Sequence, residues 1–427
     1  MRAAWAAVAR PNFGDPRLNI ITLTSILVSA CALFSYINYK FIKLPTTIGI
    51  MAISLAFSTL LLLMPALGFD ILDTAQNVVN SIDFSEALLH GMLSFLLFAG
   101  ALHVNLGELK KQKYIVTFLA FFGTLFSTAM IGGLFYLIAG GLGLDIPFWF
   151  AALFGALISP TDPIAVMAIL KKAGVPKSLE VKVVGESLLN DGIAVVLFIA
   201  LLEIATSGGS TMTEVTALFI REAVGGAVLG LILGYGVFLM LKSVDNYQVE
   251  IFLTLGLVMG GYELATYLHT SGPIAMVVSG ILVGNVGRAS AMSDRTLVNL
   301  DNFWELIDEF LNAILFFLIG VELIIIPFDS VAFQAGLIMI PVILAVRYIA
   351  ISVPVTVAKR FREFNPGTIP ILTWGGLRGG ISVALVLSMP SGEVRDILLL
   401  VTYCVVMFSI LVQGLSIGRL ARHYRKA

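Results

Sequence analysis

Three carboxylates interrupt apolar stretches of this sequence. Asp162 lies in Ser-Pro-Thr-Asp-Pro at 159–163, and Glu186 and Asp191 lie in Gly-Glu-Ser-Leu-Leu-Asn-Asp-Gly at 185–192. At the depth of a lipid bilayer, each charged side chain costs about 2.5–3.5 kcal/mol on insertion scales. Charges rarely stand there by chance, so the two motifs indicate an ion-carrying site.

Oxygen atoms in these motifs suit a monovalent cation. A dehydrated Na⁺ prefers hard oxygen ligands, and the predicted ligands are backbone carbonyls near position 161 and the side chains of Thr161, Asp162, Ser187 and Asp191. Protons compete for the same carboxylates. Either ion discharges the site, and only a neutral site crosses a low-dielectric barrier cheaply, so this competition is sufficient for exchange.

A further pair of charges is predicted to support this set. Glu186 and Asn190 are four residues apart and share one helical face. Arg347 lies inside a later apolar stretch and needs a partner, so we predict an ion pair between Glu186 and Arg347. The alternative is that Arg347 snorkels or binds a backbone carbonyl. Arg378 is predicted to face carbonyl or carboxylate oxygens rather than the ion.

Proline and glycine interrupt two of the apolar stretches. Pro160 and Pro163 remove two backbone donors, which predicts unwinding and leaves the carbonyls of Ala156 and Ser159 without helical partners. In hydrocarbon, freed carbonyls are tolerated only where they line an enclosed or watery cavity. Four glycines within 375–380 weaken the later stretch by about 1 kcal/mol each. The alternatives are an ordinary proline kink and close helix packing at the glycines.

Composition indicates an all-α polytopic membrane protein. The 427 residues are 58% hydrophobic and 12% charged, with a mean hydropathy of +0.98. A membrane span needs about 20 apolar residues. The apolar runs predict about thirteen transmembrane helices, at 17–39, 45–67, 84–105, 114–142, 146–171, 181–206, 214–241, 248–269, 271–287, 303–327, 331–359, 367–389 and 394–420.

An odd number of spans places the two termini on opposite sides. Most of the 26 Lys and Arg residues fall in loops on the side of the C-terminus, which predicts a cytoplasmic C-terminus and an external N-terminus. The two interrupted spans, 146–171 and 367–389, are seven spans apart. This spacing favours two inverted six-helix repeats about a linking seventh span, within one membrane transporter unit over 1–427.

Other classes of function have little support in the sequence. No Walker motif, dinucleotide fingerprint or catalytic nucleophile is recognisable, so neither an enzyme nor a cofactor is predicted. A formal net charge of −1 gives no argument for nucleic acid as a partner. Cys31 and Cys404 are interpreted as buried apolar residues, and His90 and His103 are candidates for sensing pH.

The charges within the membrane favour electroneutral exchange. The predicted spans contain three carboxylates, Asp162, Glu186 and Asp191, and two arginines, Arg347 and Arg378. The empty site therefore carries one net negative charge, which one monovalent cation neutralises. Further carboxylates at the site would change this count. The candidates are each predicted to lie near a span end in an interfacial position: Glu86, Asp308, Glu309 and Glu322.

Together these motifs resemble the monovalent cation:proton antiporter-1 family, which includes the NhaP-type and animal Na⁺/H⁺ exchangers. The resemblance rests on the two carboxylate motifs, on Gly-Leu-Arg-Gly-Gly at 376–380, and on later stretches at 271–285 and 303–323. It implies an NhaA-like fold with unwound crossing helices, ion binding by Asp162 and Asp191, and a homodimer in the cell membrane. Electrogenic relatives have Asp where Asn190 stands, which supports one-for-one exchange.

The resemblance also implies parts that move relative to one another. A dimerisation scaffold is expected from 17–105 and 248–327, an ion-transporting core from 114–206 and 331–420, and a linker span at 214–241. The expected activity is electroneutral exchange of Na⁺ or Li⁺ for H⁺ by alternating access, in pH homeostasis. The alternatives are K⁺/H⁺ exchange on the same scaffold, a channel-like cation pathway and an organic-anion symporter.

Overall fold

The structure is a computed structural model that describes residues 20–69, 71–207, 212–360 and 364–426. These residues form helices and their connections, with one isolated β-bridge. The α-helices are α2 (Ile20–Ile37), α3 (Thr46–Leu63), α4 (Leu72–Asn80), α5 (Phe84–Glu86), α6 (Leu93–Leu102), α7 (Leu106–Phe118), α8 (Thr124–Gly141), α9 (Phe148–Ile158), α10 (Ile164–Ala173), α11 (Lys177–Ser207), α12 (Met212–Lys242), α13 (Tyr247–Tyr267), α14 (Gly272–Leu282), α15 (Arg288–Ser290), α16 (Asp294–Glu322), α17 (Ser330–Ala358), α18 (Thr368–Trp374), α19 (Gly380–Leu387), α20 (Glu393–Phe408) and α21 (Gly414–Lys426).

Helices that can cross a membrane dominate the fold, as predicted. Within the described residues, 10 helices are long and apolar enough to span a bilayer. They are Ile21–Ile42, Thr46–Leu63, Phe84–Leu102, Leu106–Gly141, Lys177–Thr206, Ala217–Lys242, Tyr247–Tyr267, Gly272–Ser290, Ser330–Ala358 and Glu393–Tyr424. The all-helical membrane fold is therefore confirmed.

The other three predicted spans have a different character. The span at 303–327 corresponds to α16, which begins earlier and carries several charges, and those at 146–171 and 367–389 are each split into two short helices. The total of thirteen spans stays a prediction. Residues 1–19, and with them the predicted external N-terminus, lie outside the described part of the chain.

The helix of the fourth predicted span also begins earlier than expected, because a charged segment is helical. The span expected at 114–142 is continuous with α7, which begins at Leu106 and joins α8 through a π-helical turn at Leu119–Gly123. The Asn105 side chain caps α7 by accepting a hydrogen bond from the Glu108 backbone N–H at 3.0 Å. Lys and Gln in the first turns lower the local hydropathy, which is why an apolar window starts too late.

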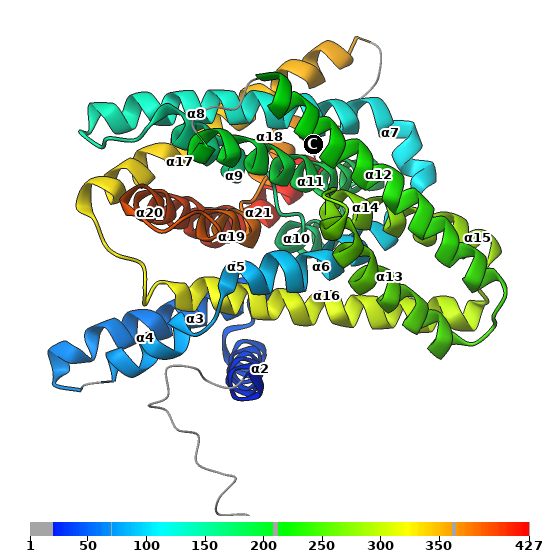
Figure 1. The fold of residues 1–427 in the computed structure, drawn as a ribbon, viewed down its shortest axis with the longest axis horizontal. Coiled ribbons are helices and arrows are strands. Elements are labelled where there is room, and N and C mark those ends of the chain that lie inside the picture. The colour runs from blue at the N-terminus through cyan, green and yellow to red at the C-terminus, as the bar shows by residue number, and fades with distance from the viewer. Residues whose placement is uncertain (1–19, 70, 208–211, 361–363, 427) are drawn as a thin grey trace, which may run out of the picture.

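The two split spans meet at the middle of the protein. The backbone N–H of Asp162 donates to the Leu377 carbonyl at 2.8 Å, which forms the isolated antiparallel bridge. Figure 1 shows α9, α10 and α11 among the C-terminal helices α17–α21, while α16 runs along the opposite side of the molecule near α3, α5 and α6. Segments from both halves of the chain thus surround the bridge.

Close helix contacts at glycine fix α9 in place. A Cβ built on Gly155 of α9 would lie 2.1 Å from the Thr128 carbonyl oxygen of α8, and one on Gly132 of α8 would lie 2.8 Å from the Ala152 Cα. Small residues allow backbones to approach in this way inside membranes. The helix that leads into the Asp162 motif is therefore held directly against its neighbour.

We predict that Gly155→Ala destabilises the protein by about 1–3 kcal/mol, because the added methyl overpacks a backbone contact. The matched control is Gly133→Ala, since a Cβ at Gly133 meets nothing within 4 Å. Removing a helical glycine there should be neutral or stabilising by up to about 1 kcal/mol. Thermal unfolding of the purified protein in detergent measures both, and equal effects would contradict the packing argument.

Candidate ion-binding site

The end of α9 presents two backbone carbonyls to a buried arginine. Because Pro160 lacks an N–H, the helix cannot continue its normal hydrogen bonding past Ser159. The Ser159 and Pro160 carbonyls accept hydrogen bonds from Arg378 Nη1 at 2.6 and 2.8 Å. The Ala156 carbonyl, expected to lack a helical partner, instead accepts from the Ser159 N–H at 3.3 Å. The last turn of α9 tightens, so one of the two carbonyls that were predicted to be free has a hydrogen-bond partner within the helix.

Arg378 belongs to the unwound segment between α18 and α19. Its side chain is buried, and its backbone N–H donates to the Ser409 hydroxyl at 2.8 Å. The predicted contact of Arg378 with carbonyl oxygens is therefore present. The role of Ser409 was not foreseen, because a lone serine in an apolar helix carries no signal of its partner.

The polar side chains of α11 meet the Asp162 motif on one side. Thr161 Oγ1 lies 2.9 Å from Ser187 Oγ and accepts from Asn190 Nδ2 at 3.0 Å. The Thr161 N–H donates to Asn190 Oδ1 at 3.2 Å. Thr161, Ser187 and Asn190 are all buried. The predicted ligands and supporting residues from the two motifs therefore lie together.

The two aspartates lie within range of each other's charge. Asp191 is 6% exposed, and among the described residues its Oδ1 is a buried atom with no hydrogen-bond partner. The Asp162 side chain packs against the unwound backbone, since a Cβ on Gly379 would lie 2.4 Å from Asp162 Oδ2. An unpartnered carboxylate oxygen is costly when buried, and a cation or a proton would relieve that cost.

The expected contact between Glu186 and Arg347 is present. Arg347 Nη1 donates to Glu186 Oε1 at 2.5 Å, and both side chains are buried. Arg347 Nη2 also lies 3.4 Å from the Leu372 carbonyl oxygen, so the ion pair and a backbone contact occur together. A Cβ on Gly376 would lie 2.8 Å from Arg347 Nε, so only glycine leaves room for this guanidinium.

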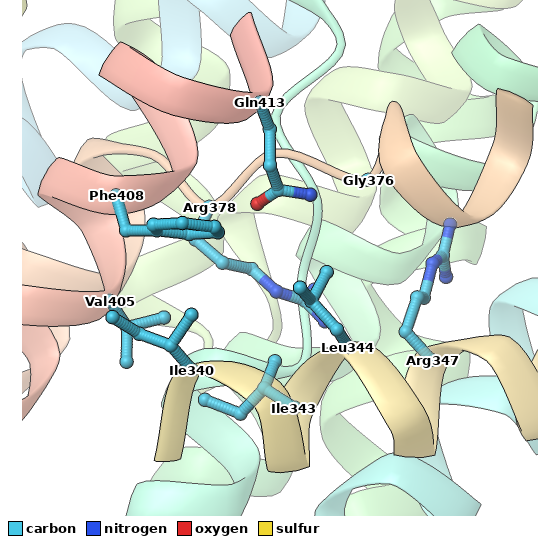
Figure 2. A pocket seen from close by; sticks show the side chains of 9 residues that line it. All are labelled: Ile340, Ile343, Leu344, Arg347, Gly376, Arg378, Val405, Phe408 and Gln413. Carbon is cyan, nitrogen blue, oxygen red and sulfur yellow. The ribbon is translucent and has the colours of Figure 1, made fainter. Parts of the chain in front are cut away.

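A small cavity lies between the two arginines. Figure 2 shows Arg347 extending from α17 and Arg378 from the unwound segment, with Gln413 above them and apolar side chains completing the wall. Gln413 Nε2 donates to the Trp374 carbonyl at 3.0 Å. The two candidate aspartates, Asp162 and Asp191, do not line this cavity. It therefore belongs to the supporting charges rather than to the candidate ligands.

Four other carboxylates were predicted to be interfacial, and one of these expectations was wrong. Glu86 and Glu309 are exposed and Asp308 is half-buried, whereas Glu322 is only 4% exposed. Glu322 ends α16 beside α20, where the Tyr403 hydroxyl donates to the Ile319 carbonyl at 3.0 Å. The positive charge of Arg395 acts on the Glu322 carboxylate through space. Helix packing that sequence spacing does not reveal covers this carboxylate.

Comparison with known proteins identifies the family. Residues 27–423 match the family described as sodium/hydrogen exchanger, transmembrane. The chain belongs to the sodium/hydrogen exchanger family. It is 50% identical over 409 residues to the Na⁺/H⁺ antiporter NhaP of Pseudomonas aeruginosa, covering 94% of this chain and 96% of that one.

Other members of the sodium/hydrogen exchanger family are similar over nearly the full length. Identity to the Na⁺/H⁺ antiporter NhaH of Halobacillus dabanensis is 36%, covering 96% of this chain and 98% of the relative. The fold is similar to that of the sodium proton antiporter MjNhaP1 from Methanocaldococcus jannaschii, with a TM-score of 0.73, 18% identity, and coverage of 94% of this chain and 98% of that chain.

No group of three or more His, Cys, Asp or Glu suited to a metal ion occurs among the residues that the structure describes. The candidate ligands of this family member are the carboxylates of Asp162 and Asp191 and the hydroxyls of Thr161 and Ser187. Such a set is weakly charged, and it suits an ion that must bind and leave rather than a permanently held metal.

We predict that Glu186→Ala and Arg347→Ala each destabilise the protein by about 3–5 kcal/mol, because each leaves an uncompensated buried charge. The double variant should cost less than the sum of the two. Unfolding in detergent gives the coupling energy. The exposed pair of Glu108 and Lys111, 2.6 Å apart, is a control whose coupling should not exceed about 0.5 kcal/mol. Full additivity at the buried pair would exclude a stabilising role for it.

Proposed function

We propose that this protein is an electroneutral secondary antiporter that exchanges Na⁺ or Li⁺ for H⁺. The observation that carries the proposal is the buried Oδ1 of Asp191, which lacks a hydrogen-bond partner among the described residues and feels the charge of Asp162. The printed names of the relatives, which are Na⁺/H⁺ antiporters, support the choice of ions. A transporter of this kind needs no enzymatic chemistry and no cofactor.

Cation and proton bind competitively to the same atoms. The cation takes oxygen ligands from Thr161, Asp162, Ser187 and Asp191, while protonation of the aspartates replaces it. Asn190 orients Thr161 through two hydrogen bonds. Because the neutralised site crosses the low-dielectric barrier more easily than the empty site, each ion permits the return step that the other requires.

The charges support exchange of one ion for one proton. Asp162, Glu186 and Asp191 stand against Arg347 and Arg378, which leaves one net negative charge for one monovalent occupant. This count leaves out the buried Glu322, which lies at the C-terminal end of α16, where the charge of Arg395 acts on it through space.

Alternating access moves an ion-transporting core, 114–206 and 331–420, against a dimerisation scaffold, 17–105 and 248–327, with 214–241 as linker. The exposed apolar side chains of α2 are available for lipid or for a second copy in a homodimer. The protein lies in the cell membrane with its N-terminus outside and its C-terminus in the cytoplasm, in accord with the distribution of Lys and Arg.

We predict that Asp191→Asn abolishes cation-driven proton movement. The amide keeps the shape of the side chain but cannot bind a proton in exchange for a cation. Dequenching of a pH-sensitive dye in proteoliposomes measures the loss. Glu203→Gln, an exposed carboxylate on the same helix, is the control and should exchange normally. Retained exchange in Asp191→Asn would falsify the assignment of the ligands.

Ion selectivity and voltage test the function itself. With the membrane potential clamped, Na⁺ and Li⁺ should drive proton movement at a rate that does not depend on voltage. A response to K⁺ alone would change the function to K⁺/H⁺ exchange. A current that needs no opposing proton gradient and does not saturate would indicate a channel-like pathway. Both outcomes would contradict the proposal.

A further inference from the structure

Polar side chains on α16 form a stripe that extends away from the crossing of the two unwound segments, which is the contact between residues 162 and 377. Asp308, Asn312 and Leu315 are separated by four and three residues, so they share one face of the helix. A Cβ on Gly380 would lie 2.3 Å from Leu315 Cδ1. Gly380 directly follows the glycine that contacts the Asp162 carboxylate. The face of α16 that carries Asp308 is therefore turned toward the crossing.

Two oxygen-bearing side chains on this stripe are arranged together. Asn312 is 1% exposed, and its Nδ2 donates to the Asp308 backbone carbonyl at 2.7 Å. This hydrogen bond holds the Asn312 amide one turn from Asp308 on the same helix. Asn312 Oδ1 is buried and has no hydrogen-bond partner in the part of the chain that the structure describes. A buried amide oxygen without a hydrogen-bond partner is energetically costly, and a bound cation would relieve that cost.

Charge links this stripe to the proposed ion-binding site. The carboxylates of Asp308 and Asp162 lie close enough to repel each other. The separation of seven positions between Asp308 and Leu315 corresponds to about 10 Å along the helix axis. Asp308 thus lies roughly two turns from the crossing, toward the helix end that is predicted to be cytoplasmic. It is too distant to share a ligand set with Asp191, and near enough to influence an approaching cation.

We propose that Asp308 and Asn312 form a transient site for a monovalent cation on the cytoplasmic approach to the exchange site. The Asp308 carboxylate and Asn312 Oδ1 supply hard oxygen ligands while the cation loses part of its water. Asp162, whose negative charge lies deeper, then draws the cation inward. This inference rests on the proposed antiport function and extends it, because it assigns a cation-handling role to α16 outside the unwound segments.

The test uses membrane vesicles of both orientations, everted and right-side-out, that contain the full-length protein. In everted vesicles the cytoplasmic face meets the added Na⁺. At constant ionic strength, Asp308→Asn should raise the half-saturating Na⁺ concentration about threefold or more in everted vesicles, with the maximal rate within about twofold of the unaltered protein. In right-side-out vesicles the same variant should match the unaltered protein. Asn312→Ala should shift saturation in the same direction, and Asp308→Glu should restore it.

Glu309→Gln is the matched control, because Glu309 is adjacent but exposed, and its half-saturating Na⁺ concentration should not change. An equal rise in the half-saturating Na⁺ concentration of this control would show that general surface charge, and not a local site, causes the effect. Unchanged saturation in Asp308→Asn at both faces, or an equal rise at both, would also overturn the approach site. These results leave the antiport function intact. That function fails separately if the unaltered protein does not exchange Na⁺ or Li⁺ for H⁺.

Discussion

The antiparallel contact between residues 162 and 377 is the constraint on which the rest of the site depends. Two helices end near the middle of the protein, and each leaves backbone groups that hydrocarbon cannot satisfy. The Asp162 N–H meets the Leu377 carbonyl, and the guanidinium of Arg378 occupies the carbonyls of Ser159 and Pro160. A buried polar group without a partner costs about 1–3 kcal/mol. Each break therefore supplies the partners of the other, and the two unwound segments depend on each other.

Glycine makes this contact possible on the side of the later break. Gly379 gives room to the Asp162 carboxylate, and Gly376 gives room to the Arg347 guanidinium. The helix is interrupted at these glycines, and the close contacts there are with side chains of the site rather than with the backbone of a neighbouring helix. The backbone is unwound where side chains of the site approach it most closely, and a larger residue at either position would displace a charged group rather than an apolar one.

The sequence predicts structural features that arise from local residue types, and it misses contacts that arise from the packing of distant helices. The helical membrane fold, the two breaks and the contact of Glu186 with Arg347 follow from hydropathy, proline and the cost of a lone buried charge. The partner of the Ala156 carbonyl depends on how the last turn of α9 tightens, which no residue type dictates. The burial of Glu322 depends on the position of α20. The spacing of residues along one helix does not reveal which distant helix covers a given side chain.

The two arginines are not equivalent, and their difference explains why a single site can alternate between ions. Arg347 is paired with Glu186, whose charge it neutralises. Arg378 binds carbonyl oxygens, which a proton or cation does not discharge, while its field reaches Asp191. In the proposed mechanism, Asp162 and Asp191 are the groups whose charge changes, beside a positive charge that stays fixed. The fixed charge limits the excess negative charge of the pair to one. One occupant, proton or cation, satisfies it, and a second would meet a site that is already neutral.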